Sequence, residues 1–347
     1  MNTAPFPFFG SPSERGASVH IFHDESGFTG DARFGHHGLL AVPDKLVEDF
    51  GGELRRLRRS YGYPHEVHFK DLGSTSPSTS PSWLLARSWL NLLFQFGLNE
   101  ARLKVFGVDM KHVEFDRARY PKPLHAYRRF AVTVAKSMVA WCYRDLQSLS
   151  VTPYTDSGNP HANYLRSRDG TLFDSFERYL VSECQKERRN GKEFYPEELT
   201  FARSLTAIPS SPSKLTPELA DSLGLTMRQL ETRSDLIQLV DLVVGCVAAA
   251  VRLDLKNEGK KALVEQVAGV LSKTYSLPLW KALDESRRFS VSFFPGPGRT
   301  PYSVSLSGVR RYGLDMLQAN AGLKQLHLSR VGFRPDSVPI ISEVESV

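Results

Sequence analysis

Residues 18–27 read Ser-Val-His-Ile-Phe-His-Asp-Glu-Ser-Gly, and this segment decides how the rest of the sequence is interpreted. Val19 to His23 is a run of β-favouring residues, which ends at the turn signal formed by residues 24–27. A second run, residues 38–42, predicts the returning strand of a hairpin. Acids at the end of a strand lie at the margin of a sheet, where α/β folds build their sites. We therefore expect Asp24 to border a functional site.

Beyond the hairpin, predicted helices alternate with predicted strands. Apolar residues at helical spacing predict helices, and short β-favouring runs predict strands. The predicted helices are residues 45–61, 83–96, 124–149, 172–186, 236–255 and 262–275, and the predicted strands are 102–108, 149–154 and 199–207, with two short strand-like pieces within 287–312. This order predicts an α/β sheet with helices on its faces.

Composition excludes several classes of protein. Of the 347 residues, 41% are hydrophobic and 24% charged, which is typical of a globular chain and excludes disordered, collagen-like and coiled-coil proteins. The three cysteines, Cys142, Cys184 and Cys246, are widely spaced and form no CxxC motif. They argue against a disulfide framework or a cysteine zinc site and indicate a reducing compartment.

The targeting signals predict a cytoplasmic protein, and the charge is compatible with a polyanionic partner but does not establish one. The sequence has 44 Lys and Arg against 38 Asp and Glu, a net charge of +6, which is compatible with a nucleic-acid partner. The first residues lack the pattern of a secretory signal. The longest apolar stretch, residues 236–253, is short and interrupted by Gln238 and Asp241, so we expect no membrane span.

The sequence predicts one main domain with additions at both ends. Residues 1–17 are rich in Pro, Gly and Ser and predict a flexible arm. Residues 73–82 are of low complexity and predict a flexible insert within a domain that covers residues 18–256. The pattern weakens beyond that domain, so residues 257–347 are expected to form a C-terminal extension whose role the sequence does not indicate.

Four acids lie where a fold could gather them: Asp24 after the first strand, Glu66 between two histidines, Asp156 after the strand at 149–154, and Asp241 on the apolar helix. Read singly, each has a structural interpretation, such as a turn, a solvated acid or an ion pair with Arg233 or Arg252. Asp241 shares a helix face with Ser234, Gln238 and Gly245, and a carboxylate there is costly unless it is paired or bound to a cation. Converging carboxylates repel one another unless cations neutralise them, and hard oxygen ligands select Mg²⁺ or Mn²⁺.

Three motifs resemble the DUF3800 family. They are His23-Asp-Glu-Ser-Gly27, Glu66-x-His68 with Leu72 after it, and Ser234-x-x-x-Gln238-Leu-Val-Asp241-Leu-x-x-Gly245, within residues 18–256. The family is similar to ribonuclease H in fold and is regarded as a group of metal-dependent nucleases. The resemblance implies a mixed sheet flanked by helices, and metal-binding, catalytic roles for Asp24, Glu66 and Asp241. Asp156 takes the position of the family's later acid, although Asp109 also ends a predicted strand.

The resulting hypothesis is a nuclease with two Mg²⁺ or Mn²⁺ ions, bridged by Asp24, which hydrolyses phosphodiester bonds in RNA or DNA. Gln238 could orient the substrate, and Lys70 could contact it. Arg55 and Arg56, within the basic run Arg-Arg-Leu-Arg-Arg at residues 55–59, could contact phosphates.

Other interpretations remain open at this stage. The chain could be a non-catalytic nucleic-acid-binding protein with a degenerate site, or a phosphatase that uses the same metals. His20-x-x-His23 and His65-x-x-His68 have zinc-ligand spacing, but neither belongs to an HExxH motif and no cysteine accompanies them.

Overall fold

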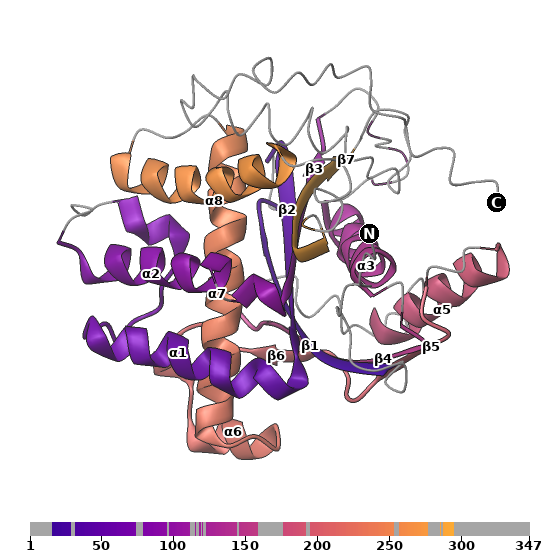
Figure 1. Cartoon of the computed structure of the whole chain (residues 1–347), viewed down its shortest axis with the longest axis horizontal. Coiled ribbons are helices and arrows are strands. Elements are labelled where there is room, and N and C mark those ends of the chain that lie inside the picture. Colours follow the sequence, from indigo (N-terminus) through magenta and orange to yellow (C-terminus); the bar gives the residue numbers. More distant parts are fainter. Residues whose placement is uncertain are drawn as a thin grey trace, which may run out of the picture.

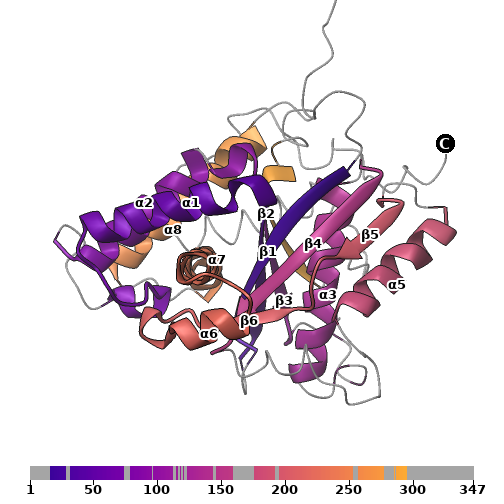
Figure 2. The same cartoon turned by 90° about the horizontal axis from the view of Figure 1, so that it is seen from below.

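The computed structural model describes residues 16–28, 32–73, 79–95, 97–111, 123–143, 146–158, 176–191, 195–252, 257–276 and 287–294, with single positions at 115, 118, 120 and 285. A mixed sheet lies at the centre with helices on both faces (Figures 1 and 2). The strands are β1 (Gly16–Ser26), β2 (Phe34–Pro43), β3 (Arg102–Asp109), β4 (Ser148–Asp156), β5 (Glu198–Phe201), β6 (Thr206–Ile208) and β7 (Phe289–Phe294). The α-helices are α1 (Val47–Ser60), α2 (Pro81–Gln95), α3 (Pro123–Cys142), α5 (Phe176–Arg189), α6 (Pro217–Ser222), α7 (Met227–Arg252) and α8 (Glu258–Ser276). Short 3₁₀ turns are η1 (Asp44–Leu46), η2 (Phe69–Gly73), η3 (Gly97–Asn99) and η4 (Pro212–Lys214).

The strand order is β5-β4-β1-β2-β3-β7, with β6 also paired to β4. β2 runs antiparallel to β1 and β3, and the other pairs are parallel. The predicted α/β class, with a mixed sheet flanked by helices, is confirmed.

Each face of the sheet carries its own apolar core. Successive side chains of a strand point to opposite faces, and in β1 Phe22 belongs to the core under α7, whereas Val19 and Ile21 belong to the core under α3. Figure 2 shows the result: α7 lies against one face with α1, α2 and α8 outside it, and α3 and α5 cover the other face. This alternation decides the face on which every acid at the end of β1 lies.

The apolar helix predicted at residues 236–255 is observed as α7, which begins at Met227. Leu236, Leu239, Leu242 and Val243 are all fully buried, because the sheet covers one side of α7 and other helices cover the other (Figure 1). A helix that is apolar all round is buried in the interior of a protein. Among the described helices, none has the length and apolarity that crossing a membrane requires.

Two predicted elements are corrected. The helix predicted at residues 124–149 ends at Cys142, because the chain must turn there to enter β4, and no glycine or proline marks that end. The strand predicted at residues 199–207 is two short strands, β5 and β6. Both pair with β4, where four residues between them face only Thr152 and Pro153, so the extra residues leave the ladder.

The predicted domain limits also need correction. α8 packs on α7, and β7 pairs with β3, so part of the predicted extension at residues 257–347 belongs to the main domain. The local sequence pattern of β7 is weak because its position depends on pairing with β3, a strand far away in the sequence. β1 begins at Gly16, inside the predicted arm, and α2 begins at Pro81, inside the predicted insert. Residues 1–15, 74–78 and 295–347 lie outside the described residues.

Two adjacent glycines of α1 give a test of how closely α1 and α7 approach. A Cβ at Gly51 would come within 2.3 Å of Thr232 Cγ2, whereas a Cβ at Gly52 would meet nothing within 4 Å. We expect Gly51→Ala to lower the free energy of unfolding by about 1–3 kcal/mol through overpacking. Gly52→Ala should raise it by about 0.5–1 kcal/mol, because alanine favours the helix. Urea denaturation measures both, and equal effects of the two variants would contradict this packing.

Candidate functional site

Asp24 and Asp156 lie beside each other at the ends of two parallel strands. The register pairs His23 of β1 with Thr155 of β4, so the next residues, Asp24 and Asp156, are level. Two positions earlier, the rings of Phe22 and Tyr154 stack at 5.4 Å in the core under α7. Because side chains alternate along a strand, both acids face α7.

Asp24 is a buried carboxyl group among other carboxyl groups. Its residue is only 8% exposed. Burial raises the pKa of Asp24 well above its ordinary value, and the charges of Asp241, Glu25 and Asp156 raise that pKa further. The backbone N–H of Glu25 donates a hydrogen bond to Asp24 Oδ1 at 2.8 Å and stabilises the charged form. Three of the four predicted acids, Asp24, Asp156 and Asp241, therefore form one electrostatic cluster, together with Glu25.

Glu25 lies on the opposite face of the sheet. Tyr127 of α3 donates a hydrogen bond to Glu25 Oε2 at 3.3 Å, and His23 Nδ1 lies 4.0 Å from the same oxygen. Burial raises the pKa of Glu25 well above its ordinary value, with a further contribution from Asp156. Burial lowers the pKa of His23 to about 3, so this imidazole is neutral. Glu25 is thus an acid whose buried side chain disfavours the charged form.

Asp109 and Asp156, between which the sequence leaves the choice open, differ in their partners. Asp109 ends β3 and forms an ion pair with Arg33, whose Nη2 lies 2.8 Å from Oδ2. Asp156 accepts hydrogen bonds from the backbone N–H groups of Gly158 and Ser210, both at 3.1 Å, and forms no ion pair within the described residues. The charge of Asp156 acts on Asp24 and Glu25, which places Asp156 in the cluster.

Asp241 is held by the segment that follows Glu66. His68 Nδ1 and the backbone N of Phe69 lie 2.7 Å and 3.0 Å from Asp241 Oδ2. The hydrogen bond to Asp241 raises the pKa of His68 to about 9, although burial opposes the shift, so His68 is charged at neutral pH. Arg233, a partner considered for Asp241, is paired with Glu48 instead.

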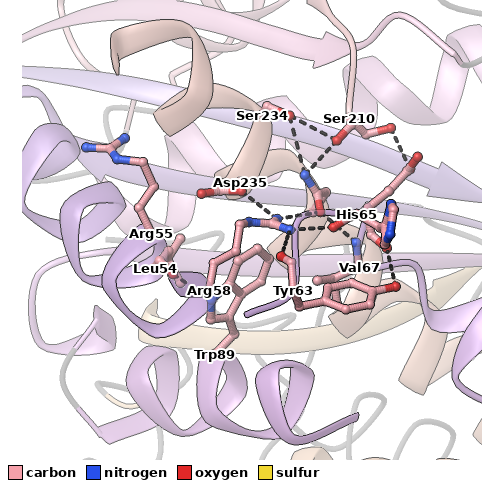
Figure 3. A network of polar contacts seen from close by, with 12 residues as sticks. Leu54, Arg55, Arg58, Tyr63, His65, Val67, Trp89, Ser210, Ser234 and Asp235 are labelled. Atoms are coloured by element: carbon pink, nitrogen blue, oxygen red, sulfur yellow. Dashed lines mark hydrogen bonds and ion pairs between the residues drawn. The ribbon is translucent and has the colours of Figure 1, made fainter. Parts of the chain in front are cut away.

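Glu66 is bound to Ser210, not to another predicted ligand. Ser210 Oγ donates to Glu66 Oε1 at 2.7 Å, and the backbone N–H of Ser210 donates to Asp156. The carbonyl oxygen of Ser210 accepts hydrogen bonds from Gln238 Nε2 at 2.6 Å and from Ser234 Oγ at 3.0 Å. Figure 3 shows Ser210 in this network beside Ser234 of α7. One serine therefore connects Glu66, Asp156 and α7, and no sequence motif marks it.

Gln238 is buried, and its amide is fully engaged within the protein. Its Oε1 accepts hydrogen bonds from the backbone N–H of Val67 at 2.8 Å and from Arg58 Nη2 at 2.9 Å. Arg58 also pairs with Asp235 and stacks on Trp89, with its guanidinium carbon 4.8 Å from the ring centroid (Figure 3). The predicted substrate contact of Gln238 is therefore replaced by a structural role: it fastens the Glu66–Phe69 segment to α7.

The three predicted basic contacts differ in position. Arg55 is buried, and its guanidinium donates to the carbonyl of Arg228 and the hydroxyl of Thr232, so its predicted phosphate contact is corrected to a link between α1 and α7. Arg56 is exposed and paired with Glu53. Lys70 is exposed on η2, two residues after His68.

The zinc interpretation of the histidines finds no support. His20 pairs with Asp44, and His23 contacts Thr155 and His37. Within the described ranges, no three His, Cys, Asp or Glu side chains lie close enough to hold one ion as they stand. The acids are therefore gathered as a cluster of charge and not as a preformed coordination sphere.

Comparisons of the chain with protein-family models, curated proteins and solved structures give no match. The resemblance to the DUF3800 family thus stays a prediction from the three motifs.

The buried acid predicts an unusual dependence of stability on pH. A carboxyl group whose pKa is raised in the folded state destabilises the fold as pH rises above its unfolded-state pKa. Asp24→Asn should therefore raise the free energy of unfolding, with a gain that appears above the ordinary pKa of 3.8 and grows toward neutral pH. Asparagine can still accept the Glu25 N–H. Urea denaturation between pH 4 and 8, without divalent cations, measures the gain.

The control is Asp221→Asn, which removes an exposed acid of α6 outside the cluster. It should leave the pH profile close to that of the unmodified chain. A gain for Asp24→Asn that is absent or independent of pH would contradict the burial of a repelled carboxylate.

Proposed function

We propose that the chain is a metal-dependent nuclease that hydrolyses phosphodiester bonds of RNA or DNA with Mg²⁺ or Mn²⁺, with two ions the expected number. The observation that carries the proposal is the state of Asp24. Its carboxyl group is buried beside Asp241, Glu25 and Asp156, and within the described residues no Lys or Arg forms an ion pair with it. A hard divalent cation is the partner that such oxygens favour.

The donor set fits this group in its chemistry. Asp24, Asp156 and Asp241 would hold the ions through carboxylate oxygens, and Glu66 would join them by leaving Ser210. When bound, such ions supply Lewis-acid activation of water and neutralise charge on the leaving oxygen. The protein's own contribution is positioning. Gln238 binds the backbone of Val67, in the segment between Glu66 and the groups that contact Asp241. Ser210, which Gln238 also binds, donates its backbone N–H to Asp156.

His68 lies at the edge of the cluster, where its hydrogen bond to Asp241 raises its pKa to about 9. In the protonated form, His68 donates a hydrogen bond from Nδ1 to Asp241 and carries a second proton at Nε2. Its side chain is 39% exposed, so a substrate phosphate can reach it.

The strand order and the DUF3800 motifs support a ribonuclease H-like nuclease, and we place the activity in the cytoplasm on the evidence of the cysteines.

The second candidate is a non-catalytic nucleic-acid-binding protein with a degenerate site. Two observations favour it. The carboxylate of Glu66 is hydrogen-bonded to Ser210, and among the described side chains no three possible ligands lie close enough to hold one ion. The two functions differ in whether Mg²⁺ or Mn²⁺ produces new ends in a nucleic acid.

The test is cleavage of labelled single-stranded and duplex RNA and DNA with Mg²⁺ or Mn²⁺, analysed on denaturing gels. The unmodified chain should cleave at least one of these, and EDTA should abolish cleavage. Asp24→Asn and Asp241→Asn should each reduce the rate by at least about 100-fold, because each removes a charged ligand. Mn²⁺ should also raise the melting temperature of the unmodified chain and not that of Asp24→Asn.

Asp156→Asn and Asp109→Asn form a matched pair, since both acids end a strand of the same sheet. We expect Asp156→Asn to lose activity and Asp109→Asn to retain it in folded protein, with Asp221→Asn as a surface control. Metal-dependent cleavage that survives both Asp24→Asn and Asp241→Asn would exclude this site. Nucleic-acid binding without cleavage would favour the second candidate.

A further inference from the structure

The start of α8 reaches the acid cluster through a single aromatic side chain. Phe69 donates its backbone N–H to Asp241 at 3.0 Å. Its ring lies over Gly245, one turn later on α7, where a Cβ would come within 2.4 Å of Phe69 Cβ. Lys260 of α8 places its Nζ 5.4 Å from the centroid of the same ring. Asp241, Phe69 and Lys260 therefore form a continuous contact from α7 to α8.

Lys260 is also tied to the segment that holds Asp241. Its Nζ donates a hydrogen bond to the backbone carbonyl of Lys70 at 2.8 Å. A lysine ammonium has three donors, and this contact occupies one of them. Lys70 takes part through its backbone, so its exposed side chain is not involved in the contact. Two lysines from distant parts of the sequence thus meet beside the site.

These two lysines differ from their neighbours in charge balance. Lys261, the next residue on α8, pairs with Glu258 at 3.7 Å. Within the described part of the chain, no carboxylate forms an ion pair with Lys70 or Lys260. The acid cluster repels an approaching phosphate, and uncompensated cations at its margin reduce that repulsion.

We propose that η2 and the first turn of α8 form a binding surface for the sugar–phosphate backbone of a nucleic acid, with Lys260 and Lys70 as its cations. The surface lies beside Asp241 and leads a phosphodiester to the acid cluster. The class of ligand rests on the proposed function. The alternative for Lys260 is a purely structural tether between α8 and η2.

The experiment measures binding of fluorescent single-stranded and duplex RNA and DNA by anisotropy, in EDTA, over a series of salt concentrations. Lys260→Gln and Lys70→Gln should each weaken binding about threefold to tenfold at low salt, and each should reduce the slope of log K against log [salt] by about 0.7–0.9, the contribution of one phosphate contact. Lys260→Arg should retain the affinity, because it keeps the charge. The four ligands show which backbone the surface prefers.

Lys261→Gln is the matched control on the same helix and should leave affinity and slope unchanged. Lys70→Gln tests the proposal even if Lys260→Gln disturbs the fold, because it breaks no described contact. Unchanged affinity and slope for Lys70→Gln and folded Lys260→Gln would overturn the proposal, as would an equal loss for Lys261→Gln.

The outcome separates this surface from the proposed function. Binding in EDTA requires no cleavage, so a loss of affinity in Lys260→Gln and Lys70→Gln supports the surface even if Mg²⁺ and Mn²⁺ produce no cleavage. If cleavage is observed, both variants should raise KM and leave kcat close to its original value. A fall in kcat with unchanged KM would contradict a role in binding and overturn the proposal.

Discussion

The candidate site is arranged around one unfavourable interaction, the burial of the Asp24 carboxyl group between the sheet and α7. Burial and three neighbouring acids all disfavour its charged form. The fold brings α7 against this end of β1 by leaving no side chain on Gly38, the register partner of Asp24, where a Cβ would come within 2.3 Å of Val244 Cγ2. Buried groups with strongly shifted pKa values, which lower the stability of the fold, are typical of functional sites.

α7 organises the rest of the site because its polar residues share one face within an apolar helix. Gln238 fastens the segment that carries Glu66 and His68, and Ser234 holds Ser210. Arg58, half-buried and stacked on Trp89, fixes the orientation of the Gln238 amide. Buried polar groups stabilise a structure only when their partners are present, so this network ties the position of the acids to the packing of α1 on α7.

The sequence predicts the parts of the site that local pattern encodes. A β-favouring run before Asp24 and an apolar helix around Asp241 are visible within a few residues, and both acids lie where those patterns place them. Ser210, Lys260 and the choice of Asp156 over Asp109 could not be predicted in this way. Each depends on a partner far away in sequence: Ser210 on Gln238, Lys260 on Phe69, and Asp109 on Arg33 through a sheet register that local pattern does not contain.

Asp24 and Glu25 are adjacent in sequence but lie on opposite faces of the sheet, so their surroundings differ. Asp24 faces α7 and the other predicted ligands, whereas Glu25 faces Tyr127 of α3 in a closed apolar core. Because the pKa values of both are raised, each of these carboxyl groups keeps its proton to a higher pH than an exposed one does. The proposed divalent cation would compete with these protons for the carboxylate oxygens, so its binding would be linked to proton release.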